Sequence, residues 1–287
     1  MEQGQSKEIT VLQGTLDDAN PLSKLRGNAL VWSNIFGKVD DFYNARIDRV
    51  SIANKTIDGN YVYGAGFPEP KDININMMPI TFYPRCIPAI YKGYSALLNK
   101  TQHNLGGREW GHVFYLTIQE GWVPVGQTQR RAGLHIERPG SIYDGGETKQ
   151  GNMLPSWGMG SMIDDVPKDG IYMASSVADS CKVWPVLITS PEEVADAHGG
   201  IEPMRKYLGE GRSLKANELC WITDRTPHEA LPIQAPADDP LPTMVYRQFF
   251  RLVVGKISVW YSKHNTPNPE GVMPDAPISD EDKFAIT

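Results

Sequence analysis

The sequence predicts a mainly β protein with a few flanking helices. Its 27 glycines and 22 prolines interrupt the chain at short intervals, which suits short strands and loops better than long helices. From residue 111 onward, runs of β-branched and aromatic residues alternate with Gly, Pro and Asp. That pattern is typical of a sandwich or a barrel.

The segments before residue 111 are of mixed type. Residues 46–67 alternate around Asp58-Gly59, a pair that favours the positive φ values of a hairpin turn. Residues 87–101 place apolar side chains at helical spacing, which predicts an amphipathic helix packed against the sheet.

The second half of the chain predicts successive strands and two short helices. The expected strands lie in residues 111–125, 133–140, 170–177, 181–188, 218–224 and 245–262. Residues 190–200 and 201–211 read as helical, with Ser190 as an N-cap and an end at Gly209. The tail from Asn265, rich in Pro, Asp and Glu, predicts a loosely held extension.

No repeat or linker marks a firm boundary, so a single domain is expected. Within it we expect an N-terminal α/β flank over 1–110, a β core over 111–262 and a C-terminal extension over 263–287.

Charge and composition exclude several classes of partner. The net charge is −6 and Lys and Arg are scattered, so neither nucleic acid nor an anionic membrane is expected. No apolar run approaches the ~20 residues that span a bilayer, and the polar start lacks the layout of a signal peptide. Three cysteines far apart indicate reduced thiols. These features favour a cytoplasmic protein with a small-molecule or protein partner.

A candidate metal site lies in the stretch GLHIERPG. His135 and Glu137 are two residues apart, so in an extended strand both side chains point to the same face. His228, in the later segment TPHEA, supplies a third ligand, and two histidines with one carboxylate form the facial triad of non-haem Fe(II). Asp224 and Glu229 flank His228, and either could orient it or replace Glu137 as the carboxylate ligand.

A pair of arginines follows in the last long strand. Arg247 and Arg251 are four residues apart on one strand face. Arginines in an otherwise apolar strand are costly unless an anion meets them, and the guanidinium fork suits a carboxylate.

These motifs together resemble the Fe(II)/2-oxoglutarate-dependent dioxygenases, and they look most like the taurine dioxygenase and clavaminate synthase branch. The residues that carry the likeness are His135, Glu137, His228, Arg247, Arg251 and Gly255. The resemblance covers roughly Gly111 to Ser262 and implies a double-stranded β-helix, or cupin-like jelly-roll.

By that resemblance, His135, Glu137 and His228 would bind Fe(II). Arg247 would hold the distal carboxylate of 2-oxoglutarate, and Arg251 would face the cosubstrate or an anionic group of the substrate. The chain departs from the family in two ways. Glu137 stands where Asp is usual, and residues 230–244 lengthen the spacing between His228 and Arg247.

Five further residues are candidates for substrate binding. Arg130 and Arg131 precede the metal motif and could bind an acidic substrate, or could be an exposed pair on a loop. Tyr115 and Gln127 could line the pocket, although a strand aromatic is often part of the core. Trp157, in a glycine-rich loop, could serve as a lid that excludes water, or could anchor the loop to the core.

The resemblance implies an oxygenase that hydroxylates, desaturates or cyclises a small organic substrate, which could bear a carboxylate. O2 would be the oxidant, and succinate and CO2 the coproducts. Two alternatives remain: a cupin-type metal enzyme that does not use 2-oxoglutarate, and a non-enzymatic β-sandwich binding module.

Overall fold

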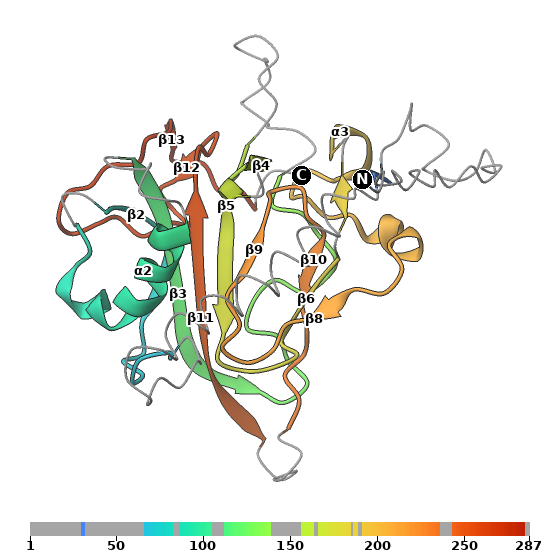
Figure 1. Ribbon diagram of the computed structural model, residues 1–287, viewed down its shortest axis with the longest axis horizontal. Coiled ribbons are helices and arrows are strands. Elements are labelled where there is room, and N and C mark those ends of the chain that lie inside the picture. The colour runs from blue at the N-terminus through green and yellow to red at the C-terminus, as the bar shows by residue number, and fades with distance from the viewer. Residues whose placement is uncertain are drawn as a thin grey trace, which may run out of the picture.

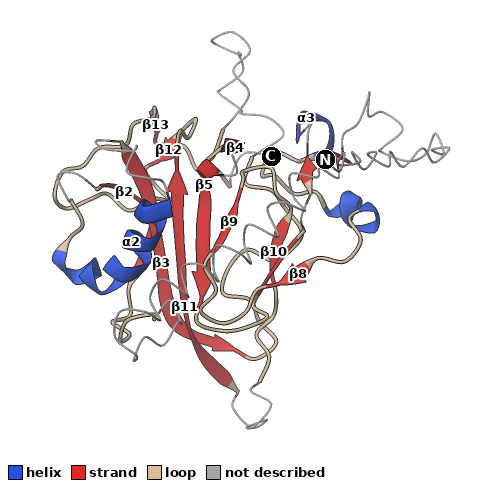
Figure 2. Cartoon of the chain, viewed as in Figure 1, coloured by secondary structure: helices blue, strands red, loops and turns tan. Residues whose placement is uncertain are grey.

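The computed structural model describes residues 30–31, 66–82, 86–104, 112–138, 156–163, 166–184, 186–188, 191–235 and 243–284. Strands dominate, and the helices are few and short (Figure 2). Every described strand pair except one is antiparallel. The expected β-rich fold with a few helices is confirmed.

The largest sheet has the order β2-β3-β11-β5-β4. Its strands are β2 (Asn74–Thr81), β3 (Val113–Pro124), β11 (Met244–Val254), β5 (Val166–Ser175) and β4 (Gly160–Ile163). The long central strands β3, β11 and β5 lie side by side in Figure 1. The edge of β5 opposite β11 pairs with β4 and then with β9 (Cys220–Ile222).

A smaller sheet has the order β10-β6-β8. It joins β10 (His228–Ala230), β6 (Cys181–Val183) and β8 (Arg212–Ser213), and it lies beyond β9 in Figure 1. Two further pairs join β1 (Leu30–Val31) to β7 (Leu187–Ile188), and β12 (Trp260–Tyr261) in parallel to β13 (Ile278–Ser279).

Two apolar clusters support these sheets. The first packs the main sheet against helix α2 (Ser95–Asn104), through buried residues that include Leu97 and Leu98. The second surrounds Trp184 and contains Leu134 and Ile136, the neighbours of His135. Burial of Leu134 and Ile136 thus fixes the backbone that carries His135 and Glu137.

The expected helical segments are confirmed with changes of type and extent, and Ser190, the expected N-cap, lies outside the described residues. Residues 87–101 form a 3-10 turn η2 (Ala89–Tyr94) that continues into α2. The two later patches form α3 (Pro191–Val194) and η3 (Glu202–Tyr207), and Gly209 follows η3 with φ +67°. The expected hairpin over 46–67 lies outside the described residues except for its last two.

The strand expected over 133–140 is wrong for its described part, 133–138. These residues form only isolated bridges, from His135 to His228 and to Gly200. The reason is that neighbouring N–H groups bond to different segments: His135 to His228, Ile136 to Gly199 and Arg138 to Asp224. No single partner strand runs alongside, so a ladder cannot propagate.

The C-terminal tail is more firmly held than expected. At a bulge in β2, Asn76 exchanges backbone and side-chain hydrogen bonds with Thr266, and its amide donates to the His264 carbonyl. Asn268 is buried and donates to the carbonyls of Pro79 and Cys86, at 2.8 and 3.0 Å. These contacts attach residues 264–268 to β2 and its C-terminal end.

Candidate functional site

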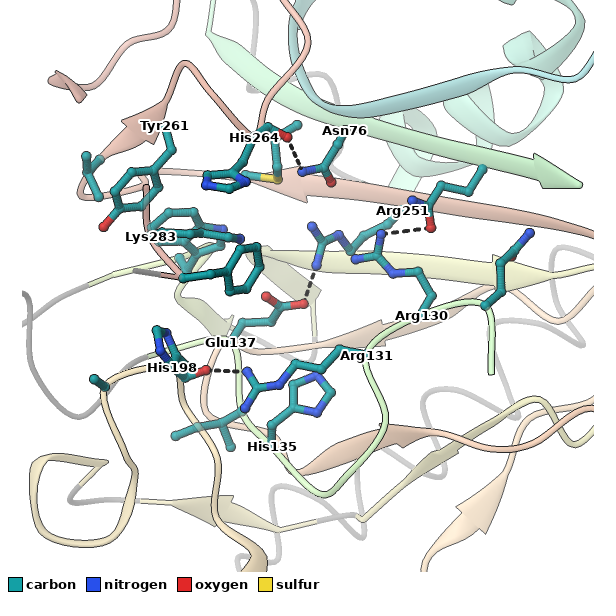
Figure 3. A pocket seen from close by; sticks show the side chains of 18 of the residues that line it. Asn76, Arg130, Arg131, His135, Glu137, His198, Arg251, Tyr261, His264 and Lys283 are labelled. Atoms are coloured by element: carbon teal, nitrogen blue, oxygen red, sulfur yellow. Dashed lines mark hydrogen bonds and ion pairs between the residues drawn. The ribbon is translucent and has the colours of Figure 1, made fainter. Parts of the chain in front are cut away.

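A cavity of about 450 Å³ lies where β2, β11 and the 129–137 segment meet the C-terminal tail. Figure 3 shows the labelled side chains that surround it. Its walls contain the following residues: Asn74, Asn76, Met77, Gln119, Gln129, Arg130, Arg131, His135, Ile136, Glu137, Trp157, Ala197, His198, Arg251, Val259, Tyr261, His264, Lys283 and Phe284.

The structure brings His135, Glu137 and His228 together. The backbones of His135 and His228 exchange two hydrogen bonds, of 3.0 and 2.9 Å, and their ring centroids are 4.5 Å apart. One carboxylate oxygen of Glu137 lies 3.7 Å from the His228 Nε2. The grouping inferred from two distant sequence segments is therefore present in the fold.

Both imidazoles are oriented by backbone carbonyls. The Nδ1 atom of His135 lies 2.7 Å from the Gly133 oxygen, and that of His228 lies 2.9 Å from the Thr226 oxygen. Because a carbonyl only accepts, each Nδ1 carries a proton, and in the neutral ring Nε2 keeps its lone pair. Burial and the neighbouring His228 lower the pKa of His135 to about 3, so this ring is neutral at pH 7.

Glu137 is ionised and paired with Arg251. Burial would raise the Glu137 pKa, but the Arg251 guanidinium and the hydrogen bond with His228 outweigh it and hold that pKa well below its usual range. The Arg251 Nη1 donates to Glu137 Oε1. The Arg251 Nε is buried and makes no hydrogen bond within the described part of the chain.

The donors are those that Fe(II) takes, two imidazole nitrogens and a carboxylate. The residues fit such an ion in type, and the Nδ1 contacts with carbonyls leave the Nε2 atom of each ring available. In the part of the chain that the structure describes, however, no three His, Cys, Asp or Glu side chains are arranged as a ready metal cluster. The carboxylate of Glu137 is paired with Arg251 instead.

Neither acidic neighbour of His228 orients its ring. Glu229, the next residue of β10, points to the opposite strand face and accepts two hydrogen bonds from Arg205. Asp224 accepts from the backbone N–H of Trp157 at 3.1 Å. The carbonyl of Thr226 takes the orienting role instead.

The two arginines of β11 differ in their surroundings. Arg251 lines the cavity. Arg247 is 1% exposed and is absent from the cavity wall; its Nε donates to the Ser175 hydroxyl and its Nη1 to the Gln129 side-chain oxygen, both at 3.0 Å. Burial lowers the Arg247 pKa to about 10. The geometry therefore favours Arg251 over Arg247 as the residue that meets a ligand.

Arg130 and Arg131 both line the cavity, as the sequence suggested. Arg130 donates to the Gln119 side chain at 3.0 Å and lies over the Phe249 ring. Burial and the nearby Arg251 lower its pKa to about 9. Arg131 donates to the carbonyl of His198.

Two of the expected pocket residues lie elsewhere. Tyr115 is buried in the core, and its hydroxyl accepts a hydrogen bond from the Asp275 N–H at 3.1 Å. Gln127 is exposed in the turn that follows β3, and Gln129, two residues later, lines the cavity. The chain turns after β3 instead of continuing as a strand, and the turn decides which side chains face the cavity. The alternation of residues in the sequence does not show where this turn lies.

Trp157 lines the cavity and is also anchored to the core. It bridges to Ile257, packs against the main apolar cluster and stacks on Tyr261, with ring centroids 6.1 Å apart. Both sequence interpretations thus describe part of its position. Whether it acts as a lid stays a prediction.

Sequence reasoning missed the cavity residues of the tail, which include His264, Lys283 and Phe284. Their segment has no motif, and the sequence predicts only an extension there. The stretch YSKHNTPN contains too few apolar residues to show the period of a helix or a strand. Asn76 was missed for a different reason. It faces the cavity because of a bulge in β2, which strand alternation does not predict.

No protein-family model matches this chain, and a search of curated proteins finds no match. Among the described residues, no helix has the length and apolarity needed to cross a membrane. The three cysteines Cys86, Cys181 and Cys220 are free thiols, as expected.

Proposed function

We propose that the protein is a non-haem oxygenase that uses Fe(II) and 2-oxoglutarate to oxidise a small organic substrate, on a double-stranded β-helix. One observation carries the proposal: His135 and His228 lie side by side with both Nδ1 atoms bound to carbonyls. Glu137 lies next to them, and His135 and Glu137 line the cavity, with His228 just behind its wall. This arrangement leaves two Nε2 lone pairs and one carboxylate for a metal.

In this proposal His135, Glu137 and His228 hold the iron. When bound, the iron would supply O2 activation coupled to decarboxylation of 2-oxoglutarate to succinate. Arg251, which lines the cavity and has a buried Nε without a hydrogen bond among the described residues, would bind the distal carboxylate of 2-oxoglutarate. Arg130 beside it adds positive charge.

The protein's own contribution is positioning and water exclusion. The carbonyls of Gly133 and Thr226 hold the two rings in one orientation. Trp157 and Tyr261 form a stacked apolar wall. The proposal leaves hydroxylation, desaturation and ring closure as possible outcomes, because they differ only in how the substrate is placed.

The test is anaerobic addition of Fe(II) and 2-oxoglutarate to metal-free protein, followed by visible absorption. A weak charge-transfer band that disappears in His135→Ala, but persists in a control variant of the exposed His112, supports the proposal. If iron binds without the band, the function is that of a cupin-type metal enzyme. If no iron binds, the fold serves as a binding module and the oxygenase proposal fails.

The cupin-type alternative has one observation in its favour. Glu137 is paired with Arg251, and Arg247 lies outside the cavity wall, so β11 contributes no second arginine to the wall that could bind a cosubstrate. Under that alternative, Arg251 would serve to keep Glu137 ionised, and 2-oxoglutarate would not alter the spectrum of the iron-loaded protein.

A further inference from the structure

The charge of the cavity wall is opposite to that of the protein. The chain carries a net charge of −6, yet four cationic side chains line the cavity against a single carboxylate, that of Glu137. The cations are Arg130, Arg131, Arg251 and Lys283. Such a local excess of positive charge favours binding of anions.

These cations form more than one group. The charge of Arg251 contributes to the lowered pKa of Arg130, and Figure 3 shows the two side chains adjacent. Lys283 lies on the side of Tyr261 and His264 in that view. If 2-oxoglutarate takes Arg251 and the metal, as proposed above, Lys283 remains for a different anion.

Within the described part of the chain, the Lys283 ammonium makes no hydrogen bond or ion pair. Its nitrogen lies 4.8 Å from the centroid of the Phe284 ring. Burial lowers its pKa to about 8; Glu137 opposes this shift, whereas Arg251, Arg130 and Arg131 add to it. A partly buried cation of this kind costs stability unless a ligand compensates it.

The position of Lys283 is fixed by the tail around it. The neighbouring Asp282 accepts hydrogen bonds from His264 Nε2 at 2.7 Å and from the Phe284 N–H at 2.9 Å. Just before it, β13 pairs with β12, and Ser262 contacts Asp280. These contacts hold residues 278–284 against 260–264. Lys283 therefore lines the cavity from a turn whose backbone is held in place.

The same region of the wall offers flat apolar surface. Trp157 and Tyr261 are stacked with an interplanar angle of 19°, and Phe284 lies edge-on to His264, 4.9 Å away. A ligand that pairs with Lys283 can therefore place an apolar body against aromatic rings.

We propose that Lys283 binds the carboxylate of the primary substrate, a small molecule with a flat or apolar body, at a site separate from that of 2-oxoglutarate. The inference rests on the proposed function, because it assumes that Arg251 binds 2-oxoglutarate. It assigns the C-terminal tail a direct part in substrate recognition.

The experiment is calorimetric titration of the full-length chain with benzoate, phenylacetate and cyclohexanecarboxylate, with and without saturating Fe(II) and 2-oxoglutarate under anaerobic conditions. At least one acid should bind in both states. Lys283→Met should weaken that binding tenfold or more and leave the charge-transfer band unchanged. Lys283→Arg should restore most of it, and Lys263→Met, an exposed lysine of the same tail, should have no effect.

Several results would overturn the inference: none of the acids binds, Lys283→Met binds as tightly as the parent, or the acids displace 2-oxoglutarate. A different result separates it from the proposed function. If no band forms in any variant while an acid still binds in a Lys283-dependent manner, the oxygenase proposal fails and the carboxylate site stands.

Discussion

At the scale of single residues, the site depends on which polar atoms are already satisfied. Both histidines use Nδ1 on a carbonyl, Arg247 is bound by two side chains, and Arg251 keeps one buried N–H without a partner among the described residues. Buried polar groups are normally hydrogen-bonded. Arg251 lines the cavity, so its Nε indicates where a ligand would bind there.

The two arginines of β11 allow a matched comparison. In Arg251→Ala the concentration of 2-oxoglutarate needed for half-saturation should rise about tenfold to a hundredfold, because a hydrogen bond to a charged group contributes about 1.5–3 kcal/mol. In Arg247→Met it should change little, since that side chain is outside the cavity wall. Titration of the charge-transfer band measures both. The reverse order of effects would return the role to Arg247.

Lys283 should affect stability in a pH-dependent way. Its pKa is about 8 in the folded protein against 10.5 for the free group, so the unfolded chain binds more protons between these values. The free energy of unfolding therefore rises with pH between about 8 and 10.5, and this gain is lost again as the pH falls through the same range. Lys283→Met should therefore be more stable than the parent at pH 7.

The gain from Lys283→Met should shrink as the pH approaches 10. Urea unfolding at pH 7 and pH 10 measures the difference, and Lys263→Met provides the exposed control. An equal gain at both pH values would mean that the lost charge is not the cause.

At the scale of elements, the bulge in β2 connects the main sheet to the tail. The register shift between Ile75 and Met78 turns Asn76 toward the cavity, and Met77 takes φ +46°. The backbone N–H groups of Asn76 and Met77 donate hydrogen bonds to the hydroxyls of Thr266 and Thr117 instead of to the neighbouring strand. A bulge of this kind re-aims side chains beside a site.

Asn268 tests how firmly the tail is attached. Asn268→Ala leaves the carbonyls of Pro79 and Cys86 without their donor, so the free energy of unfolding should fall by about 1–3 kcal/mol. Chemical denaturation gives the value. Glu270→Ala, an exposed neighbour, should lie within about 0.5 kcal/mol of the parent. Equal stability of both variants would show that the tail is not held through Asn268.

At the scale of the whole molecule, the site exists only in the folded chain. Its metal-ligand candidates come from residues 133–138 and from β10, and the cationic wall from the 129–131 segment, β11 and the tail. Because unfolding separates these segments, any ligand of the site binds the native state and stabilises it.

A thermal-shift measurement follows from this coupling. Fe(II) and 2-oxoglutarate together at about a hundred times their dissociation constants should add about 2.7 kcal/mol per bound ligand. The melting temperature should rise by several degrees in the parent and remain unchanged in His228→Ala. A shift of equal size in His228→Ala would mean that the ligands bind elsewhere.

The sequence alone determined the strand-rich fold class and the helix over 87–101. It also singled out His135, Glu137 and His228, which lie near one another in the fold and whose role as metal ligands stays a prediction. Local patterns carry this information because strand period, helical spacing and ligand spacing are properties of short segments. Part of the site could be predicted for the same reason: Arg130, Arg131, Trp157 and Arg251 line the cavity as expected.

Only the tertiary structure decided which side chains face the cavity. It placed Arg247 and Tyr115 in buried positions outside the wall, replaced Gln127 by Gln129, and brought Lys283 to the cavity from the far end of the chain. A turn, a bulge and long-range packing of the tail set these positions. Such features depend on contacts between distant segments, which no local pattern in one sequence records.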